Sequence, residues 1–511
     1  MKFLLILLIL QINLFLKIFC QEEEASTASS IILPPQPPPP HNVRTCNFVG
    51  DTTGYLRPCY FTNWAQYRDG RAKFVPEDYV PRLCTHILYA FAQFNSSFIL
   101  SPTDPADLPN ESDPKGLYQR VVELKASYFN YTLNISSNFL NYDYALKVLI
   151  SVGGWTLSQT SLFEDMMSSK ENRTAFITSS IIFMRKYGFD GIDIDYEYPK
   201  NKENFNLLFK VGGNYFVKKN KVLSCYRPSI FSSFFLSLLL YRMEFTEAFK
   251  VDKKRNCERL IITAAVSAGI ETAKQSYDIA NISKFTKKQA SLGSLYRDIL
   301  LYVEFVNLMT YDFHVSTESV TGYNSPLFSK DSLNIDSAAD YWYIEGMPKK
   351  KIKLLFIGHG WTLANPNGSR KPVGSNATGP SNATTYLKTE GIGAYFEFCE
   401  MLTDPTTKRA FDLNTKVPFL IYQKDQWFSY DNIKSFKAKI DWIKGNGYGG
   451  AYVWTLDYDD FNGECTDSVD GIYPLIGTIA RRMGNVKGPL IPISSTTEKP
   501  LMSKLHKKNF F

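Results

Sequence analysis

The segment Phe189–Pro199 reads FDGIDIDYEYP, and it indicates both a buried strand and a cluster of acidic side chains. Along a β-strand, side chains two and four residues apart point to the same face. Asp193, Asp195 and Glu197 therefore share one face of an otherwise apolar strand. Three carboxylates this close repel one another and lose hydration, so we expect at least one to hold a proton near neutral pH.

Glu197 is the outermost of the three and stands at the C-terminal end of the predicted strand. This position makes it the expected proton donor of a catalytic site. The alternative is a cation site, because alternating acidic residues also occur in calcium loops. The turn glycine and the ligand spacing of such loops are missing from the segment, so it favours acid–base chemistry and no metal.

Seven further runs have the same apolar character. Continuous Val, Ile, Leu and Tyr rather than strict alternation indicate strands covered on both faces, as in a parallel sheet. Helical stretches separate the runs, and this order predicts an α/β fold, one (β/α)8 TIM barrel. The seven runs are LRPCYFTNW (56–64), THILYAFAQF (85–94), ALKVLISVGGW (145–155), RLIITAAVSAG (259–269), EFVNLMTYDF (304–313), KIKLLFIGHGW (351–361) and YGGAYVWTLDY (448–458).

The C-terminal ends of the strands carry the chemistry in a TIM barrel. In this chain those ends carry Glu197 and Asp312, together with the three tryptophans Trp64, Trp155 and Trp454. A single Trp is most simply explained as a core side chain. Tryptophans at three strand ends instead indicate a surface that stacks on a flat ligand.

Composition excludes some classes of protein. The chain has 511 residues, with 57 Lys and Arg against 50 Asp and Glu, a net charge of +7. This balance is small for the length and argues against a dedicated nucleic-acid-binding protein. Hydrophobic residues make up 44% and aromatic residues 15%, which excludes disorder throughout. The length fits one barrel with an insertion.

The N-terminal sequence MKFLLILLILQINLFLKIFC, residues 1–20, predicts a secretory signal peptide, with a signal anchor as the alternative. We expect a Ser- and Pro-rich linker over 21–50, the barrel over 51–483 and a Ser/Thr- and Lys-containing tail over 484–511. Nine N-x-S/T sequons fit a glycosylated protein that is secreted and extracellular. They begin at Asn95, Asn110, Asn130, Asn134, Asn172, Asn281, Asn367, Asn376 and Asn382.

These motifs resemble the chitinases of glycoside hydrolase family 18 over most of 54–483. The D-x-x-D-x-D-x-E signature stands as Asp190, Asp193, Asp195 and Glu197, and further segments are similar to the strand motifs of the family. The resemblance implies a small α+β insertion between strands 7 and 8, here 361–431. The similar segments are CYFTNWAQYR, LCTHILYAFA, SVGGW, NLMTYDFH and GGAYVWTLDYDDF.

The resemblance also implies roles for these residues in a retaining mechanism in which the 2-acetamido oxygen of the substrate acts as nucleophile. Glu197 would protonate the glycosidic oxygen, Asp195 would orient the acetamido group, and Asp193 would share a proton with Asp195. Asp190 completes the catalytic set, and no cofactor is implied. The residues that would bind the sugar chain are Tyr60, Trp64, Trp155, Met309, Tyr311, Asp312 and Trp454.

The chain has eight cysteines, of which Cys20 belongs to the predicted signal peptide. The remaining number is odd, so at least one thiol is unpaired or intermolecular. Two pairs match disulfides of the family, Cys59 with Cys84 and Cys399 with Cys465. The cysteines left over are Cys46, Cys225 and Cys257.

Val211–Met243 departs from the family pattern and interrupts a helix. When Lys210 is joined directly to Glu244, apolar residues recur at helical offsets on both sides of the junction. We therefore interpret the segment as intron-derived. A surface loop and, less simply, a membrane segment are the alternatives.

Two other segments differ from the family. The stretch 285–302 lengthens the approach to strand 6. Strand 7 is short, and Ile357 and His359 stand where a substrate-contacting Tyr and often an Arg are expected. His359 is interpreted as part of the wall of the cleft rather than as a catalyst.

Two functions remain open. The first is a secreted, monomeric endochitinase that acts on chitin or chitooligosaccharides, with no nucleic-acid partner and no membrane partner after signal cleavage. The second is a chitin-binding lectin with impaired catalysis. Glu197 favours the enzyme, whereas 211–243 and the short strand 7 favour the impaired form.

Overall fold

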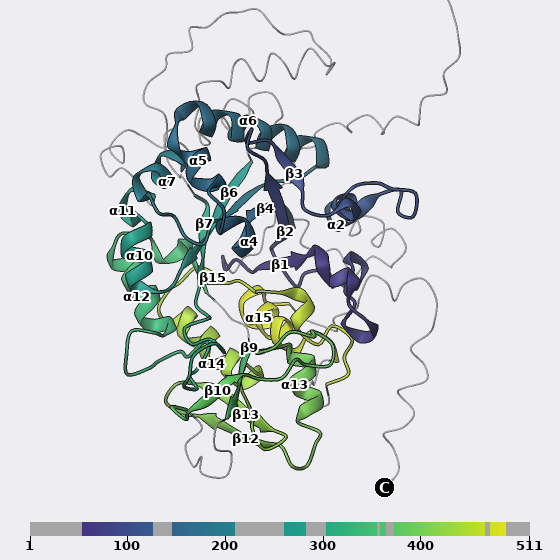
Figure 1. The fold of residues 1–511 in the computed structure, drawn as a ribbon, viewed down its shortest axis with the longest axis vertical. Helices are drawn as coiled ribbons and strands as arrows, with labels where there is room; N and C mark the ends of the chain where they lie inside the picture. The colour runs from purple at the N-terminus through teal and green to yellow at the C-terminus, as the bar shows by residue number, and fades with distance from the viewer. Residues whose placement is uncertain are drawn as a thin grey trace, which may run out of the picture. The chain divides into compact units, whose positions relative to one another are not determined.

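A parallel barrel forms the centre of the described chain, which in this computed structural model comprises residues 54–125, 146–209, 260–282, 303–354, 358–363, 373–465 and 471–486. Its strands follow the order β1-β2-β4-β5-β6-β7-β8-β15, and parallel bridges from Leu56 to Gly450 and from Cys59 to Val453 close it (Figure 1). The strands are β1 (Pro58–Thr62), β2 (His86–Phe94), β4 (Lys147–Gly153), β5 (Gly191–Asp195), β6 (Ile261–Ser267), β7 (Phe305–Met309), β8 (Ile352–Leu354) and β15 (Gly450–Ala451).

The predicted TIM barrel is confirmed, since each of the eight apolar runs contains one of these strands. Strand β5 alternates between isoleucine and aspartate, yet it is covered on both faces like the other strands. Ile192 and Ile194 are fully buried in the main hydrophobic core, on the side where the helices pack. Asp193 and Asp195 point the other way and are also buried, so both faces of the strand are covered.

Helices connect the strands and share that core. The longest, α6 (Lys170–Tyr187), begins where the side chain of Ser169 accepts from the backbone N–H of Asn172, and it ends at Gly188, whose φ is +80°. Ser169 is thus a typical N-cap, and Gly188 is a typical C-terminal cap. The other helices of the barrel are α2 (Gly116–Glu123), α4 (Gly154–Ser158), α5 (Leu162–Ser168), α7 (Lys202–Phe209), α10 (Ile270–Ser276), α11 (Ile279–Ile282), α12 (Ile335–Ile344), α14 (Ile433–Gly445) and α15 (Pro474–Gly484).

A second, antiparallel sheet lies between β8 and β15 in the chain, as predicted for the α+β insertion. Its order is β10-β9-β14-β13-β12, with β11 paired to β9. The insertion also contains helix α13 (Tyr395–Met401). Its strands are β9 (Gly358–Leu363), β10 (Ala377–Pro380), β11 (Ile392–Gly393), β12 (Lys408–Asp412), β13 (Val417–Tyr422) and β14 (Gln426–Ser429).

The run KIKLLFIGHGW, predicted as one barrel strand, is divided between the two sheets. Ile352–Leu354 belongs to the barrel, whereas Gly358–Leu363 is already part of the insertion, where His359 is in register with Ser429. The inserted sheet therefore begins slightly before the predicted boundary at Trp361. A continuous apolar run has no periodicity that marks a change of sheet, so the sequence did not reveal the division.

Both family-implied disulfides are present in the structure. Cys59–Cys84 links β1 to the segment before β2, and Cys399–Cys465 links α13 to the loop that follows β15. Each bond thus joins elements that are adjacent in space but separated in sequence by 25 and 66 residues. The leftover cysteines lie outside the described residues.

Several predictions concern parts of the chain outside the described residues. These parts are 1–20, 21–50, 211–243, 285–302, Ile357 and most of the tail 484–511. Among the helices that are described, none combines the length and apolarity needed to cross a membrane. Within the same ranges, no cluster of His, Cys, Asp and Glu could hold a metal ion.

Candidate active site

Asp193 lies fully buried inside the barrel, where side chains of β1 and of the two neighbouring strands β4 and β6 donate hydrogen bonds to it. The hydroxyls of Tyr60 and Ser151 donate to Oδ2, each at 2.8 Å, and the hydroxyl of Thr263 donates to Oδ1 at 2.6 Å. Burial raises the pKa of Asp193, and the three hydrogen bonds oppose that rise. Both oxygens are therefore fixed, and the ionised form is the one these donors stabilise.

Asp195 is next along the same face and is only 4% exposed. Burial raises its pKa well above the usual range, and the charges of Glu197 and Asp193 raise it further. Its Oδ1 is buried with no hydrogen-bond partner among the described residues. An unpaired buried oxygen is costly unless a ligand completes it, so Asp195 has the form expected of a group that meets a substrate.

Gly153 at the end of β4 leaves space beside Asp195. A Cβ at this position would stand 2.0 Å from the backbone oxygen of Asp195, and the φ of Gly153 is +123°. Both facts require glycine here. The SVGGW motif thus places β4 close enough to β5 for the register that aligns Ser151 with Asp193.

Glu197 follows the end of β5, half-buried, and its backbone N–H donates to the hydroxyl of Ser158 at 2.9 Å. Burial and, next, the negative charge of Asp312 raise the pKa of Glu197 to about 7. A carboxyl with this pKa is protonated for part of the time at neutral pH and can exchange a proton in both directions. The role of Glu197 as the proton donor stays a prediction, which this pKa fits.

Asp190 is not brought to this site. Its Oδ2 accepts from the backbone N–H of Val148 at 2.8 Å and lies 3.0 Å from Nζ of Lys125. Val148 is near the start of β4, so Asp190 stands at the N-terminal end of the barrel. The strand rises about 3.3 Å per residue, which separates Asp190 from Asp195 by roughly 16 Å. Its place in the signature is explained by the link between β4 and β5, and the expectation of a catalytic role is corrected.

Aromatic rings form a wall beside the carboxylates. The Trp454 ring lies 5.1 Å from that of Tyr60, 5.8 Å from that of Phe91 and 6.2 Å from that of Trp64, between centroids. Phe91 stacks on Trp64 at 6.0 Å and was missed by the sequence analysis. The sequence carries no signal for this role, because the place of Phe91 depends on the close approach of Gly154, where a Cβ would stand 2.6 Å from the Phe91 ring.

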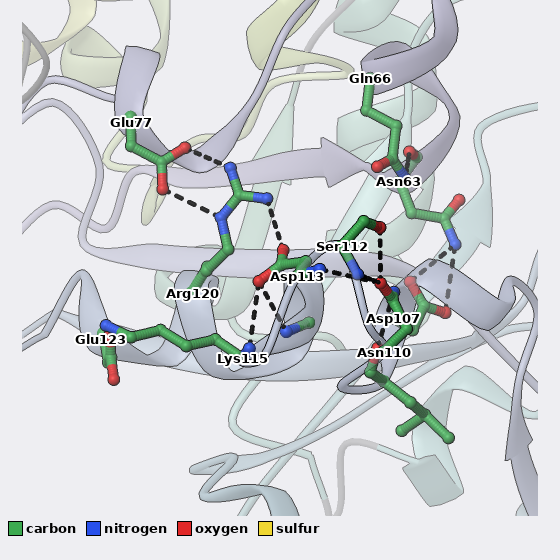
Figure 2. A network of polar contacts seen from close by, with 12 residues as sticks. Asn63, Gln66, Glu77, Asp107, Asn110, Ser112, Asp113, Lys115, Arg120 and Glu123 are labelled. Carbon is green, nitrogen blue, oxygen red and sulfur yellow. Dashed lines mark hydrogen bonds and ion pairs between the residues drawn. The ribbon is translucent and has the colours of Figure 1, made fainter.

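Trp64 and Trp155 are surface residues rather than core residues, with 39% and 61% of their area exposed. The backbone next to Trp64 is fixed by the side chain of Asn63. The amide of Asn63 donates to both carboxylate oxygens of Asp107, at 3.2 and 3.3 Å (Figure 2). Figure 2 also shows Arg120 of α2 in the same region, paired with two further acidic side chains. The buried contact between Asn63 and Asp107 thus anchors the chain next to Trp64.

The remaining predicted residues follow β7. Met309 is its last residue and is in register with Ser267 of β6. The Tyr311 ring lies 6.3 Å from that of the buried Tyr452. Asp312 adopts a φ of +56°, and its Oδ1 accepts from Nδ2 of Asn324 at 3.0 Å. The charge of Asp312 acts on Glu197, so this loop and the end of β5 face one site.

The chain is thus a TIM-barrel protein with a cluster of carboxyl groups at the C-terminal ends of the strands. Residues 57–459 match the model of glycosyl hydrolases family 18. A probable endochitinase of Caenorhabditis elegans is 41% identical over 85% of this chain and 61% of its own length. The chain belongs to glycosyl hydrolases family 18, and it spans about three fifths of that nematode relative.

Solved structures of the family include both active and inactive members. An immunomodulatory active chitinase from Trichuris suis is 37% identical, with a TM-score of 0.67, and covers 84% of this chain and 100% of its own. Human YKL-39, a pseudo-chitinase with retained chitooligosaccharide binding properties, is 31% identical, with a TM-score of 0.64 and coverage of 84% and 100%. Family membership therefore does not decide between hydrolysis and binding alone.

Proposed function

We propose that this protein is an endochitinase that hydrolyses β-1,4-linked N-acetylglucosamine polymers with retention of configuration. The observation that carries the proposal is the state of three aligned carboxyls. Asp193 has hydrogen-bond donors for an anion, the surroundings of Asp195 raise its pKa and favour its neutral form, and Glu197 has a pKa of about 7. A sugar-binding protein without catalysis has no need of a proton donor tuned in this way.

The first step would use these three groups in order. Glu197 gives its proton to the glycosidic oxygen while the acetamido carbonyl oxygen of the substrate attacks the anomeric carbon, and the glycosidic C–O bond breaks. The leaving sugar departs as an alcohol, and a positively charged oxazolinium forms. Asp195 orients the acetamido group and passes its proton toward Asp193, so that a negative charge faces the cation.

The second step reverses the proton movement. Glu197, now ionised, takes a proton from a water molecule that attacks the anomeric carbon, and the oxazolinium ring opens. Asp195 regains its proton. The stacked rings of Trp454, Phe91 and Trp64 would support the flat faces of the sugars, and Trp155 would extend the surface. Tyr60, Met309, Tyr311 and Asp312 would line the acetamido pocket.

Activity should fall above pH 7. Hydrolysis of a fluorogenic chitooligosaccharide requires protonated Glu197, whose pKa is about 7, so kcat/KM should decline about tenfold per pH unit on the alkaline side. The measurement is a pH profile of kcat/KM between pH 4 and 9, taken as about the stable range of such a domain. Activity that keeps rising through the alkaline range would contradict Glu197 as the acid.

The alternative function is a chitin-binding lectin, favoured by the family's inclusion of a pseudo-chitinase. Hydrolysis of the fluorogenic substrate together with calorimetry separates the two functions. A lectin would bind chitooligosaccharide in calorimetry but would release no fluorophore. The proposed partner in both cases is chitin or its oligosaccharides, and the proposed state is a monomer. Two disulfides support the proposed extracellular location.

Removal of Val211–Met243 should preserve or increase activity. If the segment is intron-derived, its excision joins Lys210 to Glu244 and restores one amphipathic helix. Thermal unfolding and hydrolysis should be compared between the full chain and the deletion variant. Loss of folding in the deletion variant, or transcript sequencing that finds the segment in the mature message, would contradict this interpretation. The other proposed domain boundaries stay unchanged, except that the inserted sheet begins at Gly358 rather than at residue 361.

A further inference from the structure

The loop that carries Asp312 is fastened by one buried residue, Asn324, which is 1% exposed. Its side-chain Nδ2 donates to Oδ1 of Asp312 at 3.0 Å and to the carbonyl oxygen of His314 at 3.3 Å. Its own carbonyl oxygen accepts from the N–H of Phe313 at 3.1 Å. Asn324 therefore contacts three consecutive residues of this loop.

The next residue, Ser325, fastens the same loop at its start. Its hydroxyl donates to the carbonyl oxygen of Thr310 at 2.7 Å and accepts from Nζ of Lys439 at 3.1 Å. Lys439 pairs with Asp431 at 2.6 Å, and both side chains are 1% exposed. Either charge would be costly to bury without the other, so the two side chains stay paired. The pair therefore holds Lys439 in a fixed position for its hydrogen bond to Ser325.

The tether also reaches the inserted sheet. The backbone N–H of Asn324 donates to the hydroxyl of Ser429, the last residue of β14, at 3.1 Å. Asp431 follows two residues later and Lys439 lies on α14. The loop after β7 is thus held by the end of the insertion and not by the barrel strands alone.

The backbone conformation of Asp312 explains why a tether is useful here. Its φ of +56° is a left-handed conformation that residues other than glycine adopt at a cost. The residue is also exposed, so water competes for its carboxylate. A neutral amide donor in a buried position can hold that carboxylate in one orientation without cancelling its charge.

We propose that Asn324 is a positioning residue, whose side-chain amide holds the carboxylate of Asp312 toward Glu197 and toward the acetamido group of the bound sugar. Only the part of the proposal that concerns the acetamido group rests on the proposed chitinase function. The orientation of Asp312 toward Glu197 is a property of the free protein.

The charge of Asp312 raises the pKa of Glu197, so release of Asp312 toward water should lower that pKa. Within the described ranges, the ionisable groups found to interact with Glu197 are carboxyls and phenols from four parts of the barrel. They are Asp195 on β5, Tyr198 after it, Tyr277 between α10 and α11, Tyr311 and Asp312 after β7, and Tyr452 after β15.

Asn324→Ala should move the alkaline limb of the kcat/KM profile to lower pH by about 0.5 units. It should also raise KM, because Asp312 no longer meets the acetamido group in a fixed position. In the Asp312→Asn background the same substitution should leave the limb unmoved, since the charge is already gone. Asn324→Leu, which keeps the volume but has no donor, replaces the alanine variant if that one does not fold.

Asn334→Ala is the matched control. Asn334 is equally buried at 2% exposed, and its Oδ1 accepts from the N–H of Ser337 at the start of α12. This variant should lose thermal stability and keep the wild-type pH profile. Equal shifts of the limb in Asn324→Ala and Asn334→Ala would overturn the proposal, because a general loosening would then explain both.

A titration separates this proposal from the proposed function. The carboxyl carbon of Glu197, observed by NMR in protein labelled with ¹³C at Glu and assigned with Glu197→Gln, reports its pKa without any substrate. A lower pKa in Asn324→Ala supports the positioning role even if the protein hydrolyses nothing. An unchanged pKa overturns it even if the protein is an active chitinase.

Discussion

Glu197→Gln should lower kcat for chitooligosaccharide hydrolysis by about 10³-fold. The amide keeps the size of the side chain and cannot donate a proton with the acidity of a carboxyl whose pKa is about 7. The acetamido nucleophile belongs to the substrate and stays in place, so the loss measures protonation of the leaving oxygen. The measurement is steady-state release of the fluorophore at pH 6.

Binding should survive the same substitution. The stacked rings of Trp454, Phe91 and Trp64 do not depend on the charge of Glu197, so calorimetry should give a Kd within about threefold of the wild type. Glu164→Gln is the matched control, because Glu164 accepts from the hydroxyl of Tyr196 at 2.8 Å beside the site. It should retain activity. Hydrolysis that persists in Glu197→Gln would overturn the mechanism.

The sequence predicts the barrel because its signal is local. Each strand is an apolar run, and the alternation of isoleucine and aspartate in β5 fixes which side chains face the interior. The same alternation brings Asp193 and Asp195 to one face, with Glu197 beyond the strand end. The tryptophans at strand ends are found in this way too, because a strand end can be read from the sequence.

Contacts between strands could not be predicted, because they depend on register and on the approach of distant loops. Phe91 reaches the aromatic wall only because Gly154 leaves room for its ring. Asn324 contacts Asp312 across a loop, and no periodicity in the sequence predicts that contact. Asp190 shows the opposite failure, since its place in a signature suggested a role that the length of β5 excludes.

Asp195→Asn should lower kcat by about 10²–10³-fold, roughly 3–4 kcal/mol of transition-state stabilisation. Burial and then the charges of Glu197 and Asp193 raise the pKa of Asp195 well above its usual range, which favours its neutral form in the free protein. An amide matches the shape and hydrogen bonding of that neutral form, so KM should change little. The amide cannot ionise, however, so the variant lacks the negative charge that would stabilise the positively charged oxazolinium.

Asp193→Asn tests the same step from behind. The hydroxyls of Tyr60, Ser151 and Thr263 all donate hydrogen bonds to Asp193. In the asparagine variant an NH₂ group replaces one of the accepting oxygens. Two donors would then meet, and at least one hydrogen bond would be lost. That variant should lose both thermal stability and kcat, whereas Asp195→Asn should lose kcat alone. If Asp195→Asn instead retains kcat within about threefold, the positive charge of the intermediate must be stabilised by another group. Asp312, whose charge acts on Glu197, would then be the candidate to test.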